Sequence, residues 1–103
     1  LTPVVGVEQE NGGNVPRSFR LEQNFPNPFN PMTSIRFTIP QTRFVSLKVY
    51  DLLGRQVASL VDETKTPGTY TVSWNAQGVG SGIYFYRIIY GEFMETKKLI
   101  LVK

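Results

Sequence analysis

Two consecutive stretches of strictly alternating apolar residues constrain the fold of this chain more than any other feature. Apolar side chains stand at every second position in residues 35–39 and again in residues 45–49, and Pro40 and Gln41 interrupt the pattern between them. A period of two places these side chains on one face of a β-strand, whereas a helix would need a period of about 3.6. Two such stretches in succession predict a pair of half-buried strands.

A turn over residues 51–54 is expected to reverse the chain after the second stretch. Its last residue, Gly54, can adopt the positive φ that a short hairpin loop requires after a type I turn. The strand that returns from this turn is predicted to span residues 55–61, with Val57 and Leu60 facing inward.

Polar segments that contain glycine or proline are predicted to be loops between further strands. Residues 62–67 are polar and lead to a turn at Pro67 and Gly68, and residues 75–82 contain three glycines. The segment between these two loops alternates again and ends near Trp74, so it is predicted to be a strand.

The last two strands are predicted to form a hairpin. Residues 83–90 are almost continuously apolar, and we assign to the core the face that lacks Arg87, namely Tyr84, Tyr86 and Ile88. A two-residue turn at Gly91 and Glu92 leads into residues 93–102, whose inward side chains are Leu99 and Leu101. Short strands at this regular spacing predict an all-β, immunoglobulin-like antiparallel β-sandwich of about seven strands.

The N-terminal part of the chain has no periodic pattern. Residues 1–20 are expected to be a linker to an upstream cargo domain, because they are rich in Gly and polar residues and the chain reads as an excerpt from a longer protein. An edge strand at residues 4–7 is the alternative. In residues 21–33, three prolines exclude a helix and predict a rigid extended segment that Phe25 and Phe29 attach to the domain. The folded domain is thus expected to span residues 21–103.

The composition excludes most kinds of catalytic site. The chain has no His and no Cys, which excludes histidine-based acid–base chemistry, a thiolate nucleophile and a structural zinc site. Among the carboxylates only Asp62 and Glu63 are adjacent, and we interpret them as solvated loop residues, with weak oxygen-ligated ion binding by residues 62–67 as the alternative. The domain is therefore expected to be neither an enzyme nor a cofactor-binding protein.

Charge and aromatic content narrow the choice of binding partners. The basic residues stand singly except for Lys97 and Lys98, so no nucleic-acid-binding track is predicted, and no apolar run approaches the length of about 18 residues that a membrane helix needs. The tyrosines and Trp74 leave a carbohydrate-binding platform as an alternative, but the place of Trp74 in an alternating strand favours the core. Tyr84 follows a glycine-rich corner, where its hydroxyl is expected to bind backbone.

Residues 21–103 resemble the type IX secretion system C-terminal sorting domain, type A. The resemblance rests on six motifs in the correct order: Leu21–Pro31, Val49–Arg55, Pro67–Tyr70, Trp74-Asn75, Ser81–Arg87 and Lys97–Lys103. Within these motifs the structural signature comprises Pro26, Asn27, Pro28, Phe29, Asn30, Pro31, Asp51, Gly54, Arg55, Gly68, Tyr70 and Trp74. A more distant similarity is to the immunoglobulin-like domain of flagellar hook-capping proteins.

This resemblance implies a non-catalytic sorting signal of a protein exported by Bacteroidetes or related bacteria. Such a protein would cross the periplasm, and the domain would direct it through the outer-membrane translocon to the cell surface or the medium. A sortase-like protease would then remove the domain by cleavage in or near residues 1–20. The expected partners are the translocon and this protease, and the domain is expected to be a monomer. A carbohydrate-binding or passive spacer module of a secreted enzyme is the alternative.

The resemblance also implies which residues the translocon recognises. They belong to the last two predicted strands: Gly82, Ile83, Tyr84, Lys97, Lys98, Leu99, Leu101, Val102 and Lys103. A closing strand at a sheet edge would offer unpaired backbone groups for strand addition by a receptor, and its lysines would steer it toward an acidic surface. From spacing alone, edge protection is the favoured interpretation of these lysines, and only the resemblance favours recognition. Residues 21–31 are interpreted as a cover over one sheet edge and not as a ligand.

Overall fold

The alternating segments form strands in the computed structural model, which describes residues 17–103. No helix occurs in this range. The strands are β1 (Arg20–Leu21), β2 (Met32–Ile39), β3 (Arg43–Tyr50), β4 (Gln56–Lys65), β5 (Gly68–Asn75), β6 (Gly82–Tyr90) and β7 (Phe93–Leu101). The predicted linker and its alternative edge strand at residues 4–7 lie almost wholly outside the described range. Its last part is described, and there Phe19 stacks on Tyr90 with the ring centroids 5.5 Å apart.

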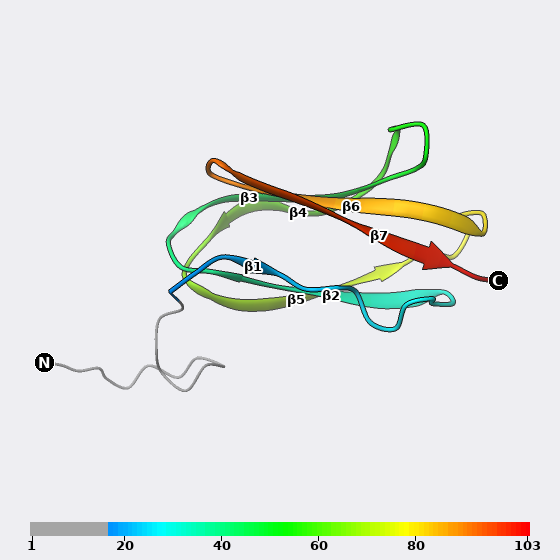
Figure 1. Cartoon of the computed structure of the whole chain (residues 1–103), viewed down its shortest axis with the longest axis horizontal. Helices are drawn as coiled ribbons and strands as arrows, with labels where there is room; N and C mark the ends of the chain where they lie inside the picture. The colour runs from blue at the N-terminus through cyan, green and yellow to red at the C-terminus, as the bar shows by residue number, and fades with distance from the viewer. Residues whose placement is uncertain (1–16) are drawn as a thin grey trace, which may run out of the picture.

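The strands form two sheets that pack face to face (Figure 1). One sheet has the order β1-β2-β5 and the other has the order β4-β3-β6-β7, and every paired strand is antiparallel to its neighbour. This arrangement confirms the predicted all-β sandwich. The strand β7 occupies one edge of the four-stranded sheet, as the closing strand was expected to do.

The core lies between the inner faces that the alternation predicted. Its largest fully buried side chains come from β2, β3, β6 and β7: Ile35, Phe37, Ile39, Val45, Leu47, Val49, Tyr86, Ile88, Tyr90, Leu99 and Leu101. Each fully buried large apolar side chain stabilises the fold by about 1.5–3 kcal/mol relative to exposure. The apolar side chains whose two-residue period predicted the strands therefore also supply, by their burial, the free energy that holds the sheets together.

The returning strand β4 departs from the prediction in two ways. It continues to Lys65, so the expected loop at residues 62–67 is reduced to residues 66–67. Leu60 is partly buried against the core as predicted, but the fully inward residue is Val61 (5% exposed) and not Val57 (37% exposed). Two register shifts cause the second difference, because they leave Leu60 and Val57 of β4 without a partner in β3, and these insertions change which β4 side chains face the core. The polar end of β4 is tolerated because β4 is an edge strand that is open to solvent.

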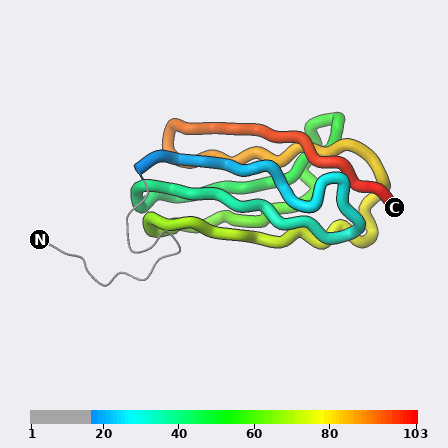
Figure 2. The backbone as a smooth tube through the Cα atoms, turned by 60° about the horizontal axis from the view of Figure 1, so that its bottom comes forward, coloured from blue at the N-terminus to red at the C-terminus, as the bar shows by residue number. Residues whose placement is uncertain are grey.

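Residues 22–31, which we call the proline strip, connect the two sheets at the β7 edge (Figure 2). Phe25 bridges to Ser34 of β2, and Phe29 bridges to Leu101 of β7. Only half of the predicted attachment is therefore correct, since Phe29 is buried whereas Phe25 is 80% exposed. The strip is bent rather than uniformly extended, because bends separate its two bridges.

Candidate functional site

The residues predicted for recognition divide into buried and exposed sets. Because β6 and β7 pair in continuous register, side chains alternate between the core and the outer face of the sheet. Tyr84, Leu99 and Leu101 point inward and are buried, so they position the hairpin and are not available to a partner. Gly82 and Lys97 are half-buried, and the exposed members are Ile83, Lys98, Val102 and Lys103.

The exposed members gather at the C-terminal end of β7. On the outer face, Ile83 lies opposite Ile100, and Phe85 lies opposite Lys98. The glycine-rich loop beside them is held by Tyr84, whose hydroxyl donates a 2.6 Å hydrogen bond to the carbonyl of Gly80, and this confirms the predicted backbone contact. These residues form a fixed surface of apolar and basic side chains.

A rigid hairpin tip, residues 51–55, projects from the sheet at the same end (Figure 1). Both carboxylate oxygens of Asp51 accept bonds inside the turn, from the amides of Leu53 and Arg55 at 2.9 Å each and from the Arg55 guanidinium at 2.8 Å. Hydrogen bonding to the Arg55 amide is the main cause that lowers the pKa of Asp51 below its ordinary value. Gly54 has the predicted positive φ, at 84°.

This ordered turn presents two large apolar side chains to solvent. Leu52 is 66% exposed and Leu53 is 77% exposed. A hollow of about 250 Å³ lies between them and the Gly82–Tyr84 segment, and a second of about 330 Å³ separates Leu52 from Phe85. Sequence analysis missed both leucines as candidates. The available signal was two adjacent large apolar residues inside a turn, where neither the sheet nor the core can bury them.

The β7 edge is less open than expected, because the proline strip pairs with its second half. Phe29 donates its amide to the Ile100 carbonyl at 3.0 Å and accepts the Val102 amide at 2.9 Å. The Asn27 side chain accepts the Ile100 amide at 2.9 Å, and the Gln23 side chain donates to the Lys98 carbonyl at 2.7 Å. The predicted edge of unpaired backbone groups is therefore covered at Lys98, Ile100 and Val102, and the interpretation of residues 21–31 as an edge cover is correct.

A buried tyrosine hydroxyl of β6 anchors the proline strip to the core. The Tyr86 hydroxyl accepts the amide of Asn24 at 2.9 Å and donates to the carbonyl of Glu22 at 2.7 Å. Burial raises the pKa of this hydroxyl to about 12. The buried Asn24 side chain in turn donates to the Thr33 hydroxyl and to the Pro26 carbonyl, at 2.8 and 3.1 Å. Sequence analysis did not single out this network, which joins residues far apart in the chain.

The remaining signature residues have structural roles or lie exposed on the proline strip. Trp74 is buried and contacts the rings of Phe29 and Tyr84, as the core interpretation predicted. The Tyr70 hydroxyl donates to the Thr66 carbonyl at 2.7 Å, beside Gly68 with φ 154°. Pro31 accepts the Ala76 amide through its carbonyl, whereas the exposed signature residues of the strip are Pro26, Asn27, Pro28 and Asn30.

Residues 17–103 contain no group of three or more side chains that could hold a metal ion. Within the same range, no helix is long and apolar enough to cross a membrane.

Comparison with known proteins identifies a family and two solved structures of similar fold. Residues 23–103 match the family described as the secretion system C-terminal sorting domain. A crystal structure of dimeric latent PorU from Porphyromonas gingivalis is similar in fold, with a TM-score of 0.63 and 23% identity over 84% of this chain and 10% of that chain. PorZ, described as an essential bacterial surface component of the type IX secretion system of the same organism, gives a TM-score of 0.56 and 21% identity over 79% of this chain and 11% of that chain.

No curated protein matches the chain. The chain spans about a tenth of the length of the solved proteins that it resembles.

Proposed function

The chain belongs to the family of secretion system C-terminal sorting domains, and we propose that the exposed end of its four-stranded sheet is the surface by which the export machinery recognises it. A domain of this family is the sorting signal of the type IX secretion system, so the protein that carries it is secreted or displayed at the cell surface. The proposed surface comprises Leu52, Leu53, Ile83, Lys98, Val102 and Lys103.

The observation that carries this proposal is the exposure of large apolar side chains on an ordered turn beside the signature strands. Leu52 and Leu53 are 66% and 77% exposed although Asp51 holds their backbone in one conformation. Binding to a pre-ordered surface costs less conformational entropy than binding to a mobile loop. Lys98 and Lys103 add positive charge at the same end, which favours an acidic partner surface.

The remaining parts of the proposal concern the path and fate of the carrier protein. The domain acts as a non-catalytic monomer and guides its cargo from the periplasm through the outer-membrane translocon. A sortase-like protease then separates cargo from domain in or near residues 1–20. The cargo is a separate domain upstream, and residues 21–103 are the sorting domain.

An export assay tests the proposal. Residues 1–103 are fused to a periplasmic reporter in a host with a type IX system, and surface and medium reporter are compared with the periplasmic pool. We expect efficient export of the fusion, loss of export when residues 97–103 are deleted, and at least a fivefold loss for the double substitution Leu52→Ser and Leu53→Ser.

Phe44→Ser is the matched control, because Phe44 is also an exposed apolar residue (54%) but pairs with Thr64 near the other end of the sheet. Equal export of the double variant and the control would show that the hairpin is not part of the recognition surface. Equal export with and without residues 97–103 would overturn the proposal as a whole.

The carbohydrate-binding alternative loses its main support from the burial of the aromatic residues that would form a platform. Trp74, Tyr84 and Tyr86 are 6%, 8% and 0% exposed. Sugars bind to the open face of aromatic rings, which these three residues do not offer. Retardation of the domain in a polysaccharide affinity gel would restore that alternative.

A further inference from the structure

The first half of β7 presents an open sheet edge, and we propose that an extended segment of a partner protein adds to the sheet there as a further strand. The site is residues 94–98, and the partner segment carries an apolar side chain opposite Met94 and an acidic one opposite Lys98. This inference rests on the proposed function, because it names how a component of the export machinery binds the domain.

The direction of the β7 backbone groups follows from the hydrogen bonds of Ile100. Both its amide and its carbonyl bond to the proline strip, so this residue directs its backbone away from β6. Backbone groups alternate along an antiparallel strand, and β6 and β7 pair without a register shift. The backbone amides and carbonyls of Met94 and Thr96 and the backbone amide of Lys98 therefore also point outward, and within residues 17–103 none of these backbone groups has a hydrogen-bond partner.

The covered half of the edge shows that β7 accepts an extended chain. Phe29 forms a parallel bridge to Leu101, with backbone bonds at 2.9 and 3.0 Å on either side. The proline strip then leaves the edge, so the same row of donors and acceptors continues unoccupied toward Phe93. Only an extended polypeptide can satisfy amides and carbonyls that recur at every second residue, at intervals of about 6.8 Å.

The side chains around the open edge define the chemistry of the partner. Met94 is 63% exposed on the outer face, beside Ile89 at 41%. On the same face, Lys48, Arg87 and Lys98 form no ion pair with an acidic residue of the described range. This combination fits an apolar and an acidic residue four positions apart on the same face of the added strand.

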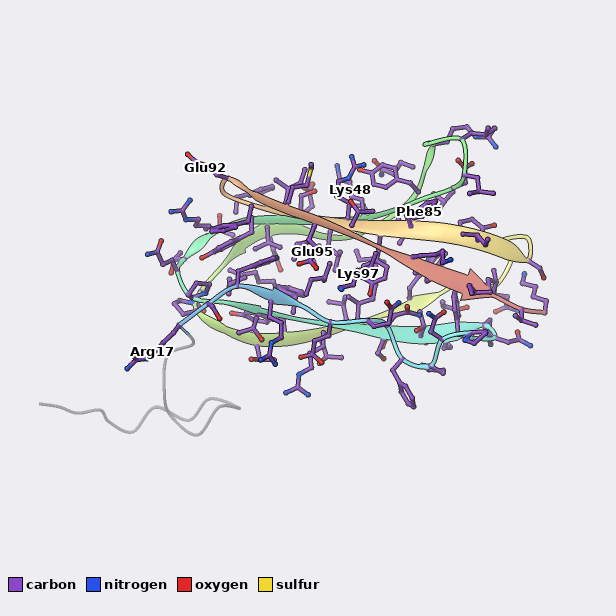
Figure 3. The ribbon with its side chains drawn as sticks, viewed as in Figure 1. Arg17, Lys48, Phe85, Glu92, Glu95 and Lys97 are labelled. Carbon is purple, nitrogen blue, oxygen red and sulfur yellow. The ribbon has the colours of Figure 1, made fainter. Side chains whose placement is uncertain are left out.

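The inner side of the edge does not oppose strand addition. Lys97 forms an ion pair with Glu95 at 3.3 Å, and both side chains point from β7 toward the other sheet, whereas Lys48 lies on the opposite side (Figure 3). Lysines on an edge strand normally discourage pairing. Here Glu95 neutralises Lys97, so an incoming strand meets no net charge on that side.

A proline substitution tests the open edge without removing a bond of the β6–β7 ladder. Thr96→Pro removes the outward amide, and the proline ring obstructs an incoming strand, while proline is tolerated at an edge position of this kind. Thr96→Val is the matched control, because it keeps the amide and, like Thr96→Pro, loses the bond between the Arg87 guanidinium and the Thr96 hydroxyl.

In the export assay we expect at least a tenfold loss of export for Thr96→Pro and export within twofold of the parent for Thr96→Val. Thermal melting should show that both variant domains are folded. A folded Thr96→Pro variant that is exported normally would overturn the inference, and loss of export for the double substitution Leu52→Ser and Leu53→Ser would show that the proposed function still stands. No export of the parent fusion would instead contradict the proposed function.

A second variant tests the same edge if Thr96→Pro does not fold. For Met94→Glu we expect at least a fivefold loss of export, and export within twofold of the parent would contradict strand addition.

Sedimentation of the purified domain tests whether a second copy of the domain, and not a partner protein, occupies the edge. Antiparallel self-pairing about Thr96 would place Glu95 opposite Lys97, so a dimer that Thr96→Pro abolishes would assign the edge to self-association and overturn the partner assignment.

Discussion

Replacing Tyr86 by Phe is expected to loosen the proline strip without leaving a cavity. The phenylalanine ring fills the same space, but the amide of Asn24 loses its acceptor and the carbonyl of Glu22 loses its donor. Asn24 is 2% exposed, so water cannot readily replace the lost acceptor. Glu22 is half-exposed, and its carbonyl is easier to rehydrate.

The size of the effect follows from these two hydrogen bonds. A buried donor left without an acceptor costs about 1–3 kcal/mol, and loss of an ordinary hydrogen bond costs about 1 kcal/mol. We therefore expect Tyr86→Phe to lower the free energy of unfolding by about 2–3 kcal/mol. For a domain of this size, that corresponds to a fall in Tm of about 10–20 °C.

Urea denaturation and amide hydrogen exchange together check this prediction. Exchange should accelerate at the amides of Ile100 and Val102, which the proline strip protects, more than at Leu99 in the β6–β7 ladder. Tyr84→Phe is the control, because its hydroxyl binds the Gly80 carbonyl and does not contact the strip. A loss of stability below about 0.5 kcal/mol, or unchanged exchange at Ile100 and Val102, would refute the reasoning.

Three further predictions concern the same elements. Phe29→Ala should cost about 3–5 kcal/mol in urea denaturation because Phe29 is buried, whereas Phe25→Ala should change stability by less than about 0.5 kcal/mol because Phe25 is exposed; similar costs would contradict the assigned burial. Gly54→Ala should cost about 1–2 kcal/mol, since φ is 84° and an added Cβ meets no neighbour, so a neutral effect would argue against this turn. Burial raises the pKa of Tyr86 from its ordinary value of 10.0 to about 12, so the neutral hydroxyl makes its full contribution to the free energy of unfolding below pH 10. Its contribution, at most about 3 kcal/mol, should fade as the pH rises from about 10 to 12, and Tyr86→Phe should lack this pH-dependent loss.

The sequence was sufficient to predict the strands and their inward faces, because burial of one face imposes a period of two on each strand. Tyr84, Tyr86 and Ile88 were assigned correctly because Arg87 marks the opposite face. The position of Val57 was not predictable in this way. Its orientation depends on register shifts between two strands, and the alternation within one strand does not record them.

The site was less predictable than the fold because it depends on contacts between distant parts of the chain. Asn27 and Ile100 are separated by 73 positions, yet their hydrogen bond helps to close half of the β7 edge. The composition of residues 21–31 indicated an extended cover but not which edge it would protect. Exposure of Leu53 likewise follows from the direction in which the hairpin projects, which no local pattern specifies.

The position of the two chain ends has a mechanical consequence. Arg17 and Lys103 lie at opposite ends of the sandwich, and the strands run along the line that joins them (Figures 1 and 3). A load applied between an upstream cargo and a gripped tail would therefore act parallel to the strands, and the hydrogen bonds between the proline strip and β7 would share it at the same time. Such a shearing geometry resists pulling better than one in which bonds open singly, so the domain is built to bear tension along its length.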